Sequence, residues 1–336
     1  MWYRLSKPLI AAVVIGVLGL TSPAAAQCVG QNLIAELPAE EAKALRARAG
    51  AVPFATGNLW RALRGDQEIT LLGTYHMDDP RHEATMAVVA PILDRAQTVL
   101  VEAGPDEIAA LQSRLAREPE LMVKTSGPTL PEVLEPEVWQ ALADAMRARG
   151  VPPFMAAKMQ PWYLSMLLSI PPCALEAMGE DRGLDARVIE AAGARGLTLR
   201  ALEPYDTVFG VFAALTPEDQ LSMITASLAL EGRSEDMSVT MADSYFSEEA
   251  QLIWEFSRDQ ALGLPGAKPE QVAREFAVME EALMVRRNQA WIPVLTEAAA
   301  NGPVLAAFGA LHLPGDQGVL ALLQAEGFTL ERLAFR

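Results

Sequence analysis

Two short apolar runs in the chain stop at a glycine, and a histidine follows three residues after that glycine. The first run leads through Gly73 to His76, and the second leads through Gly309 to His312. Apolar runs of this length that stop at glycine are typical of buried strands. We therefore predict two strands that each deliver an imidazole at the C-terminal end, where the glycine permits a sharp exit turn. One copy of this motif is weak evidence of function, but two copies among three histidines indicate a shared site.

The pattern around the first motif predicts a strand–helix–strand unit. Residues 57–72 read as two strands joined by a tight turn, residues 80–97 as a helix, and residues 98–102 as an apolar strand that ends on Glu102. A crossover of this length makes the strands on either side of the helix parallel, so that both C-termini lie on one edge of the sheet. His76 and Glu102 are therefore predicted neighbours at the edge where ligands bind in open α/β sheets.

The rest of the chain is mainly helical from about residue 105 to 300, interrupted by a strand near 198–203 that ends on Glu203. Asp185 stands near the start of the helix before that strand. There is no internal repeat beyond the paired motif and no change of composition along the chain. We predict one domain, residues 27–336, of α/β (α+β) class, with a central mixed, largely parallel sheet and a large helical insertion.

Composition and charge narrow the classes of partner. A hydrophobic fraction of 51% with 21% charged residues is typical of a folded globular protein. The formal charge is −16, and removal of the first 26 residues takes away Arg4 and Lys7 and leaves −18. A surface this acidic repels nucleic acid and anionic lipid, so neither is an expected partner.

The first 26 residues resemble a cleavable signal peptide. Arg4 and Lys7 precede an apolar stretch, 9–20, and the small residues 24–26 provide a cleavage site. The apolar stretch falls short of the roughly 20 residues that a membrane span needs. We expect a periplasmic or secreted protein without stable membrane insertion after cleavage, and an uncleaved N-terminal membrane anchor is the alternative.

Export changes the interpretation of the two cysteines, Cys28 and Cys173. An even number of cysteines in an oxidising compartment favours a disulfide, which would tie the mature N-terminus to a distant part of the chain. Two independent free thiols remain the alternative at this stage.

The residues predicted at the sheet edge suit metal chemistry. Two imidazoles, from His76 and His312, and the carboxylate of Glu102 are ligands for a divalent transition metal such as Mn, Co or Zn. Such an ion polarises a carbonyl, as hydrolysis of an amide or ester requires. Arg287 would then stabilise the developing oxyanion and Asn288 would support it.

Other hydrolytic and nucleotide motifs are missing from the sequence. It contains no Gly-x-Ser-x-Gly nucleophile motif, no Gly-x-Gly-x-x-Gly loop after a predicted strand, and no His-Glu-x-x-His helix. The third histidine, His82, lies on the helix after the first motif, and we interpret it as a surface or capping residue, not a third ligand.

Several segments together resemble the TraB/GumN family, which is similar to the Tiki metalloprotease domain and more distantly to erythromycin esterase and ChaN-like proteins. The matching segments follow the family order over almost the whole mature chain: Leu72-Gly73-Thr74-Tyr75-His76, Val101-Glu102-Ala103-Gly104, Gly183-Leu184-Asp185, Ala201-Leu202-Glu203, Arg287-Asn288 with Trp291, and Phe308-Gly309-Ala310-Leu311-His312.

The resemblance implies an α/β sheet with a helical elaboration. In the Tiki branch the two motif histidines and a glutamate are associated with metal-dependent proteolysis, which here points to His76, His312 and Glu102, with Arg287 and Asn288 in support. The matching segments also make Gly73, Gly309, Asp185 and Glu203 candidate site residues. The esterase-like relatives are thought to use a histidine base without a metal, and ChaN-like relatives bind haem, so both remain open.

The leading hypothesis is an exported, metal-dependent hydrolase, peptidase-like, that acts on a peptide or on a small ester or amide. One alternative is a metal-independent, esterase-like hydrolase with a histidine base. The other is a periplasmic binding or interaction protein without turnover. The arrangement of the side chains separates these alternatives, because a two-histidine site requires His76 to face His312 with Glu102 between them.

Overall fold

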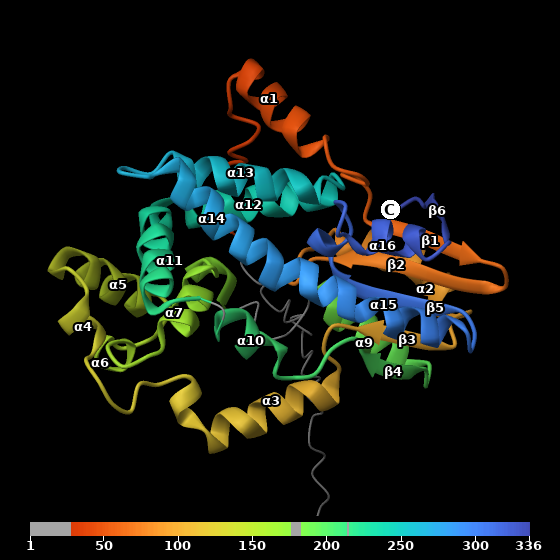
Figure 1. The fold of residues 1–336 in the computed structure, drawn as a ribbon, viewed down its shortest axis with the longest axis horizontal. Helices are drawn as coiled ribbons and strands as arrows, with labels where there is room; N and C mark the ends of the chain where they lie inside the picture. The colour runs from red at the N-terminus through yellow and green to blue at the C-terminus, as the bar shows by residue number, and fades with distance from the viewer. Residues whose placement is uncertain (1–27, 176–182, 214) are drawn as a thin grey trace, which may run out of the picture.

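The computed structural model describes residues 28–175, 183–213 and 215–336 (Figure 1). The predicted signal peptide, 1–26, lies outside these residues. None of the helices in the described part of the chain is long and apolar enough to cross a membrane.

A six-stranded mixed sheet forms the core of the molecule, with the strand order β4-β3-β5-β2-β1-β6. The strands are β1 (Leu59–Arg64), β2 (Gln67–Thr74), β3 (Thr98–Val101), β4 (Thr198–Ala201), β5 (Val304–Gly309) and β6 (Thr329–Arg332). The four strands from β4 to β2 are mutually parallel, and β1 pairs antiparallel with both β2 and β6. The predicted α/β class with a central, largely parallel sheet is therefore confirmed.

The order of the strands was not predicted from the sequence. Strands β2 and β3 are joined through α2 (His82–Leu93) and run parallel, but β5 lies between them and pairs with both. The central strand is thus the one that carries the second glycine–histidine motif. The first motif and Glu102 flank it from opposite sides.

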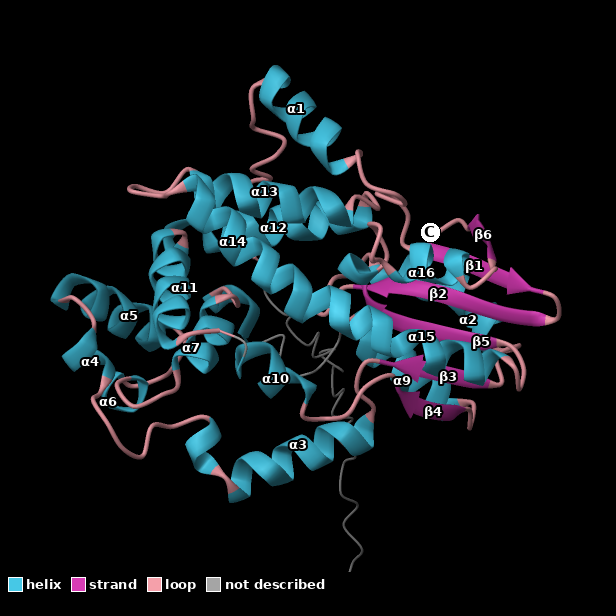
Figure 2. Cartoon of the chain, viewed as in Figure 1, coloured by secondary structure: helices cyan, strands magenta, loops and turns pink. Residues whose placement is uncertain are grey.

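Alternating side chains explain why the central strands are apolar throughout. In β5, Ala306 and Phe308 contact a core on one face of the sheet, whereas Leu305 and Ala307 contact a core on the other face. Helices α15 (Arg286–Ala299) and α16 (Val319–Ala325) cover the first face. Helices α2, α9 (Leu184–Ala194) and α12 (Ser234–Phe246) cover the second. Figure 2 shows the sheet between these helices.

A helical lobe extends from the side of the sheet at which the parallel strands end (Figure 1). Its elements are α3 (Pro105–Arg117), η1 (Pro119–Leu121), α4 (Leu130–Val133), α5 (Pro136–Ala148), α6 (Pro153–Ala156), α7 (Pro161–Leu168), η2 (Pro172–Ala174), α10 (Thr207–Ala213), α11 (Pro217–Ala229) and η3 (Glu231–Arg233). It has its own apolar core, which includes Leu142, Met146, Leu164 and Ile224. Arg149 is bound to Glu231 by two hydrogen bonds and caps several helix-end carbonyls, which ties α5, α7 and η3 together.

The other helical elements that the structure describes complete the fold. They are α1 (Ala39–Ala49), α13 (Ala250–Leu262), α14 (Pro269–Glu280), the π-helical segment η4 (Glu281–Val285) and the short turn η5 (Ala310–His312). The predicted disulfide is present between Cys28 and Cys173, so the start of the described chain is bonded to the helical lobe.

Candidate active site

The predicted histidines and glutamate meet at the end of the central strand. His76 follows β2, Glu102 follows β3 and His312 lies in η5 directly after β5. Gly309 stands between them: a methyl group in place of its hydrogen would lie 3.3 Å from Glu102 Oε1, 3.6 Å from His76 Nε2 and 3.7 Å from His312 Cδ2. The three side chains therefore converge on one point above the sheet edge.

The glycines of the two motifs have roles besides the predicted turn. Neither Gly73 nor Gly309 has a positive φ, and β2 continues beyond Gly73 to Thr74. A β-carbon at Gly73 would approach the Cα of Ala310 to 2.9 Å and a methyl of Leu313 to 2.7 Å. Gly73 thus lets the second motif pack against the first, and Gly309 leaves open the space on which the site converges. The predicted exit turn is present at Gly309, where β5 ends and η5 begins, but the prediction was wrong at Gly73, which close packing requires and backbone conformation does not.

Asp185 favours the protonated state of His76. Its carboxylate lies 2.7 Å from His76 Nδ1 and also accepts a hydrogen bond from Thr74 Oγ1. The charge of Asp185 raises the pKa of His76 to about 9, although burial acts in the opposite direction. The imidazole keeps 64% of its side-chain surface exposed and turns Nε2 towards Gly309. At neutral pH His76 is therefore a cation that faces the site.

The helix that carries Asp185 is seated directly on the first motif. A β-carbon at Gly183 would fall 2.2 Å from the carbonyl oxygen of His76, so only glycine permits this contact. The N–H of Leu184 donates to the carbonyl of Tyr75 at 3.0 Å. These backbone contacts bring the start of α9, and with it Asp185, to the ring of His76.

His312 lies in the opposite environment. Its ring is buried, packs 4.4 Å from the ring of Trp291 and has Nδ1 2.6 Å from Asn288 Oδ1. The Asn288 amide donates to the carbonyl of Gln317 at 2.8 Å, which directs its oxygen at the imidazole. Nδ1 is consequently the donor and Nε2 carries the lone pair. Burial, reinforced by nearby Arg287 and His76, lowers the pKa of His312 to about 3, so this ring is neutral.

Arg287 links the carboxylates of the site. Its Nε and one Nη donate to the two oxygens of Glu203, each at 2.8 Å, and the same Nη donates to Glu102 Oε2 at 2.5 Å. The other Nη lies 3.2 Å from Nε2 of His312. Trp291 supports the cluster by donating to Glu203 at 3.1 Å.

Glu102 is ionised within this cluster. Burial alone would raise its pKa, but the charges of Arg287 and His76 and the N–H of Gly309, which donates to Oε1 at 2.6 Å, together lower the pKa to about 2. The carboxylate is therefore a fixed negative charge at neutral pH.

A π-helical turn precedes the arginine. The segment η4 interrupts the long helix α14–α15 just before Arg286, and such turns occur often at functional sites. Arg287 itself donates to the carbonyl of Leu283 within this turn at 3.1 Å. The widened turn thus supplies an acceptor that holds the guanidinium over the site.

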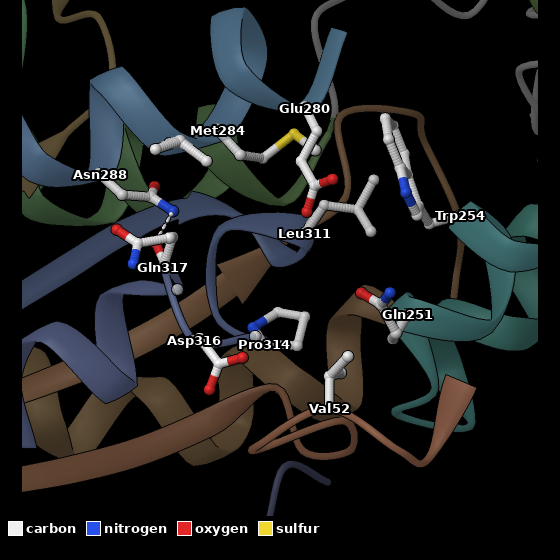
Figure 3. A pocket seen from close by; sticks show the side chains of 13 residues that line it. Val52, Gln251, Trp254, Glu280, Met284, Asn288, Leu311, Pro314, Asp316 and Gln317 are labelled. Carbon is white, nitrogen blue, oxygen red and sulfur yellow. Dashed lines mark hydrogen bonds between the residues drawn. The ribbon is translucent and has the colours of Figure 1, made fainter. Parts of the chain in front are cut away.

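A cavity of about 210 Å³ lies next to Asn288, the hydrogen-bond partner of His312 (Figure 3). Trp254, Met284, Leu311 and Pro314 form its apolar wall, and Asn288 closes it on the side of the site. The amide that orients His312 therefore also forms part of the cavity wall.

His82 was interpreted incorrectly as a surface or capping residue. It is fully buried at the start of α2, among the rings of Tyr75, Tyr245 and Phe246. Its Nε2 lies 2.9 Å from the carbonyl of Met77, which holds the loop after the first motif. A polar residue placed among aromatic rings of a distant helix cannot be recognised from its own neighbours in sequence.

The predictions also missed Thr74, Tyr245 and the backbone acceptors of the site. Thr74 lies inside the first motif and was within reach of sequence reasoning. The hydroxyl of Tyr245 donates to the carbonyl of Gly73 at 2.9 Å from a helix 172 residues away, and no local signal marks that contact.

The residue types at this edge fit a divalent transition metal. Each imidazole has Nδ1 held by an outer partner and Nε2 free of the backbone, as ligating histidines usually do, and Glu102 supplies a third donor. As the side chains stand, no three His, Cys, Asp or Glu residues in the described part of the chain are grouped closely enough to hold an ion. The guanidinium of Arg287 occupies the position beside Glu102 and His312.

Comparison with known families agrees with this arrangement. The sequence profile of the TraB/PrgY/gumN family matches residues 58–332, from the first strand to the last. The chain belongs to the TraB/PrgY/gumN family. The matched region contains every residue of the candidate site, and family membership is thus consistent with the fold described above. A search of curated proteins finds no match to the chain.

Proposed function

We propose that this member of the family is an exported hydrolase, peptidase-like, that cleaves a peptide or a small ester or amide. The observation that carries the proposal is the convergence of His76, Glu102 and His312 on the open space above Gly309. Ionisable side chains with displaced pKa values cluster at catalytic sites, and the three here surround one point.

The charge of each side chain determines its proposed role in the reaction. Arg287 and protonated His76 place positive charge next to the space above Gly309, where the oxyanion of an acyl-transfer reaction would be stabilised. Asp185 and Asn288 keep the two rings oriented, which preserves the geometry during the reaction. Glu203 holds Arg287 from the other side.

The proposal includes a divalent transition metal, Mn, Co or Zn, held by Nε2 of His312, the carboxylate of Glu102 and Nε2 of His76, which would give up its proton to bind the ion. When bound, this ion would act as a Lewis acid on the substrate carbonyl. The support is the paired outer partners of the two Nδ1 atoms.

A second candidate is metal-independent hydrolysis with a histidine base, and the position of Arg287 favours it. The guanidinium already provides a cation beside Glu102 and His312. His76 would be the base, because Nε2 of His312 is engaged by Arg287. Activity should then rise as the pH approaches the His76 pKa of about 9.

Export is supported by the Cys28–Cys173 disulfide, since such bonds persist in oxidising compartments. Fusion of residues 1–26 to a reporter enzyme that is active only outside the cytoplasm tests this part. Retention of the reporter in the cytoplasm would overturn it.

The catalytic proposal is tested with the mature protein purified without a metal-chelating tag. We expect turnover of a fluorogenic peptide library or of simple aryl esters that falls on the order of 10²–10⁴-fold in His76→Ala and in His312→Ala. Metal analysis and activity after EDTA treatment separate the two candidates. Full activity in both alanine variants, with circular dichroism showing intact folds, would overturn the site itself.

A further inference from the structure

Arg287 and a metal ion would need the same space. Nε2 of His312 carries its only free lone pair, and one Nη of Arg287 is hydrogen-bonded to it at 3.2 Å. A ligating nitrogen lies about 2.0–2.1 Å from its metal. An ion at that distance along the same lone pair would overlap the N–H group of the arginine.

Glu102 is the second proposed metal ligand whose binding atom is already occupied by Arg287. Its Oε1 accepts the N–H of Gly309, and its Oε2 accepts the other Nη of Arg287 at 2.5 Å. The guanidinium therefore neutralises the one carboxylate that would attract a cation to the site. A divalent ion that approached with Arg287 in place would meet a fixed positive charge at contact distance.

Arg287 is also held by groups other than these two ligands. Two of its hydrogen bonds go to Glu203, and another goes to the carbonyl of Leu283 in the π-helical turn. The ring of Trp291 lies 5.0 Å from the guanidinium carbon and supports the same side. The Nη that donates to Glu102 also donates to Glu203, and the Nη beside His312 also donates to Leu283, so these anchors hold the guanidinium against the two atoms that a metal would need.

We propose that Arg287 is an internal competitor for the metal site: a divalent transition ion binds His312 and Glu102 only when the guanidinium is displaced from both. This inference rests on the metal-dependent form of the proposed function. It makes Arg287 a residue that sets the metal affinity of the site, in addition to its contribution to oxyanion binding.

The test is isothermal titration of Mn²⁺, Co²⁺ and Zn²⁺ into the metal-free mature protein at pH 7.5. The variant Arg287→Gln should bind on the order of tenfold more tightly than the wild type, within the usual range of coupling between two sites. A matched control is Arg286→Gln, which removes the same charge from the adjacent helix position, where the arginine is exposed and paired with Glu281. The control should bind as the wild type does.

Loss of Arg287 leaves the half-buried Glu203 without its cation, so the double variant Arg287→Gln/Glu203→Gln is included to preserve the fold. It should also bind more tightly than the wild type. Equal affinity in the wild type and both Arg287 variants overturns the competition but leaves the metal proposal standing. Absence of binding in the folded Arg287 variants overturns both, because the donors would then be uncovered.

Discussion

The two glycine–histidine motifs have the same local sequence pattern but occupy opposite environments. His76 is 64% exposed and bound to a carboxylate, whereas His312 is 5% exposed and bound to a neutral amide. The pKa of the first is raised to about 9 and that of the second is lowered to about 3. One motif thus supplies a cation and the other a neutral lone pair. The partner of Nδ1 and the degree of burial determine the role of each ring, and the motif alone does not.

The largest expected effect is a loss of activity, and it distinguishes Gly309 from Gly73. A β-carbon at Gly309 would fill the space between Glu102, His76 and His312 at distances of 3.3–3.7 Å, which the fold tolerates with small adjustments. We expect Gly309→Ala to fold normally and to lose activity on the order of 100-fold, because the substrate is displaced. The measurement is turnover per folded molecule, with thermal unfolding as the check on the fold.

Gly73→Ala should instead reduce the stability of the fold. Its β-carbon would meet the backbone of Ala310 at 2.9 Å, which has no freedom to withdraw. We expect a loss of about 1–3 kcal/mol in the free energy of unfolding, as is usual for overpacking, measured by urea denaturation. A stable Gly73→Ala protein would show that the two motifs do not need this close contact.

The next prediction exchanges the partners of the two rings. In Asp185→Asn the pKa of His76 should fall from about 9 towards its ordinary value of 6.5, because the charge of Asp185 is the main cause of its rise. In Asn288→Asp the pKa of His312 should rise, since the new carboxylate favours the imidazolium. NMR titration of the imidazole signals measures both, and the mature chain has only three histidines to assign. His82, which does not contact either changed residue, serves as the internal reference.

A further prediction concerns the pH dependence of stability. The pKa of His312 is lower in the folded than in the unfolded protein, so the unfolded chain binds more protons as the pH falls below 6.5. Stability is therefore lost from pH 6.5 down towards pH 3, at up to about 1.4 kcal/mol per pH unit for one proton. His312→Gln should flatten this acid limb in urea unfolding experiments.

His76 should instead affect the stability of the protein at alkaline pH. Its pKa is raised on folding, so its contribution is complete below pH 6.5 and is lost as the pH rises through about 9. His76→Gln should leave the acid limb unchanged and flatten only the alkaline one. An identical pH response in the two glutamine variants would contradict the assignment of opposite environments.

Sequence reasoning identified most of the candidate site but not the reasons for its residues. Gly73 was selected for a turn, yet it is required by close packing against Ala310, more than 200 residues away, whereas Gly309 leaves open the space on which the site converges. Glu203 and Asp185 were candidates only because they lie in matching segments. The structure shows that Glu203 holds Arg287, 84 residues away, and that Asp185 holds His76, 109 residues away. The buried position of His82 depends on contacts with Tyr245 and Phe246 of α12, and no residue near His82 in the sequence indicates these contacts.

Local features of the chain were enough to predict the strand-forming runs, the parallel crossover after the first motif, the cysteine pair and the histidines and carboxylates of the site. These follow from apolar periodicity, turn residues and residue chemistry, all of which are local properties of the chain. Tertiary structure alone decided that β5 lies between β2 and β3, that His312 is neutral while His76 is charged, and that Arg287 stands between Glu102 and Glu203. Burial and charge proximity are properties of the folded arrangement, and they convert one repeated motif into two different chemical groups.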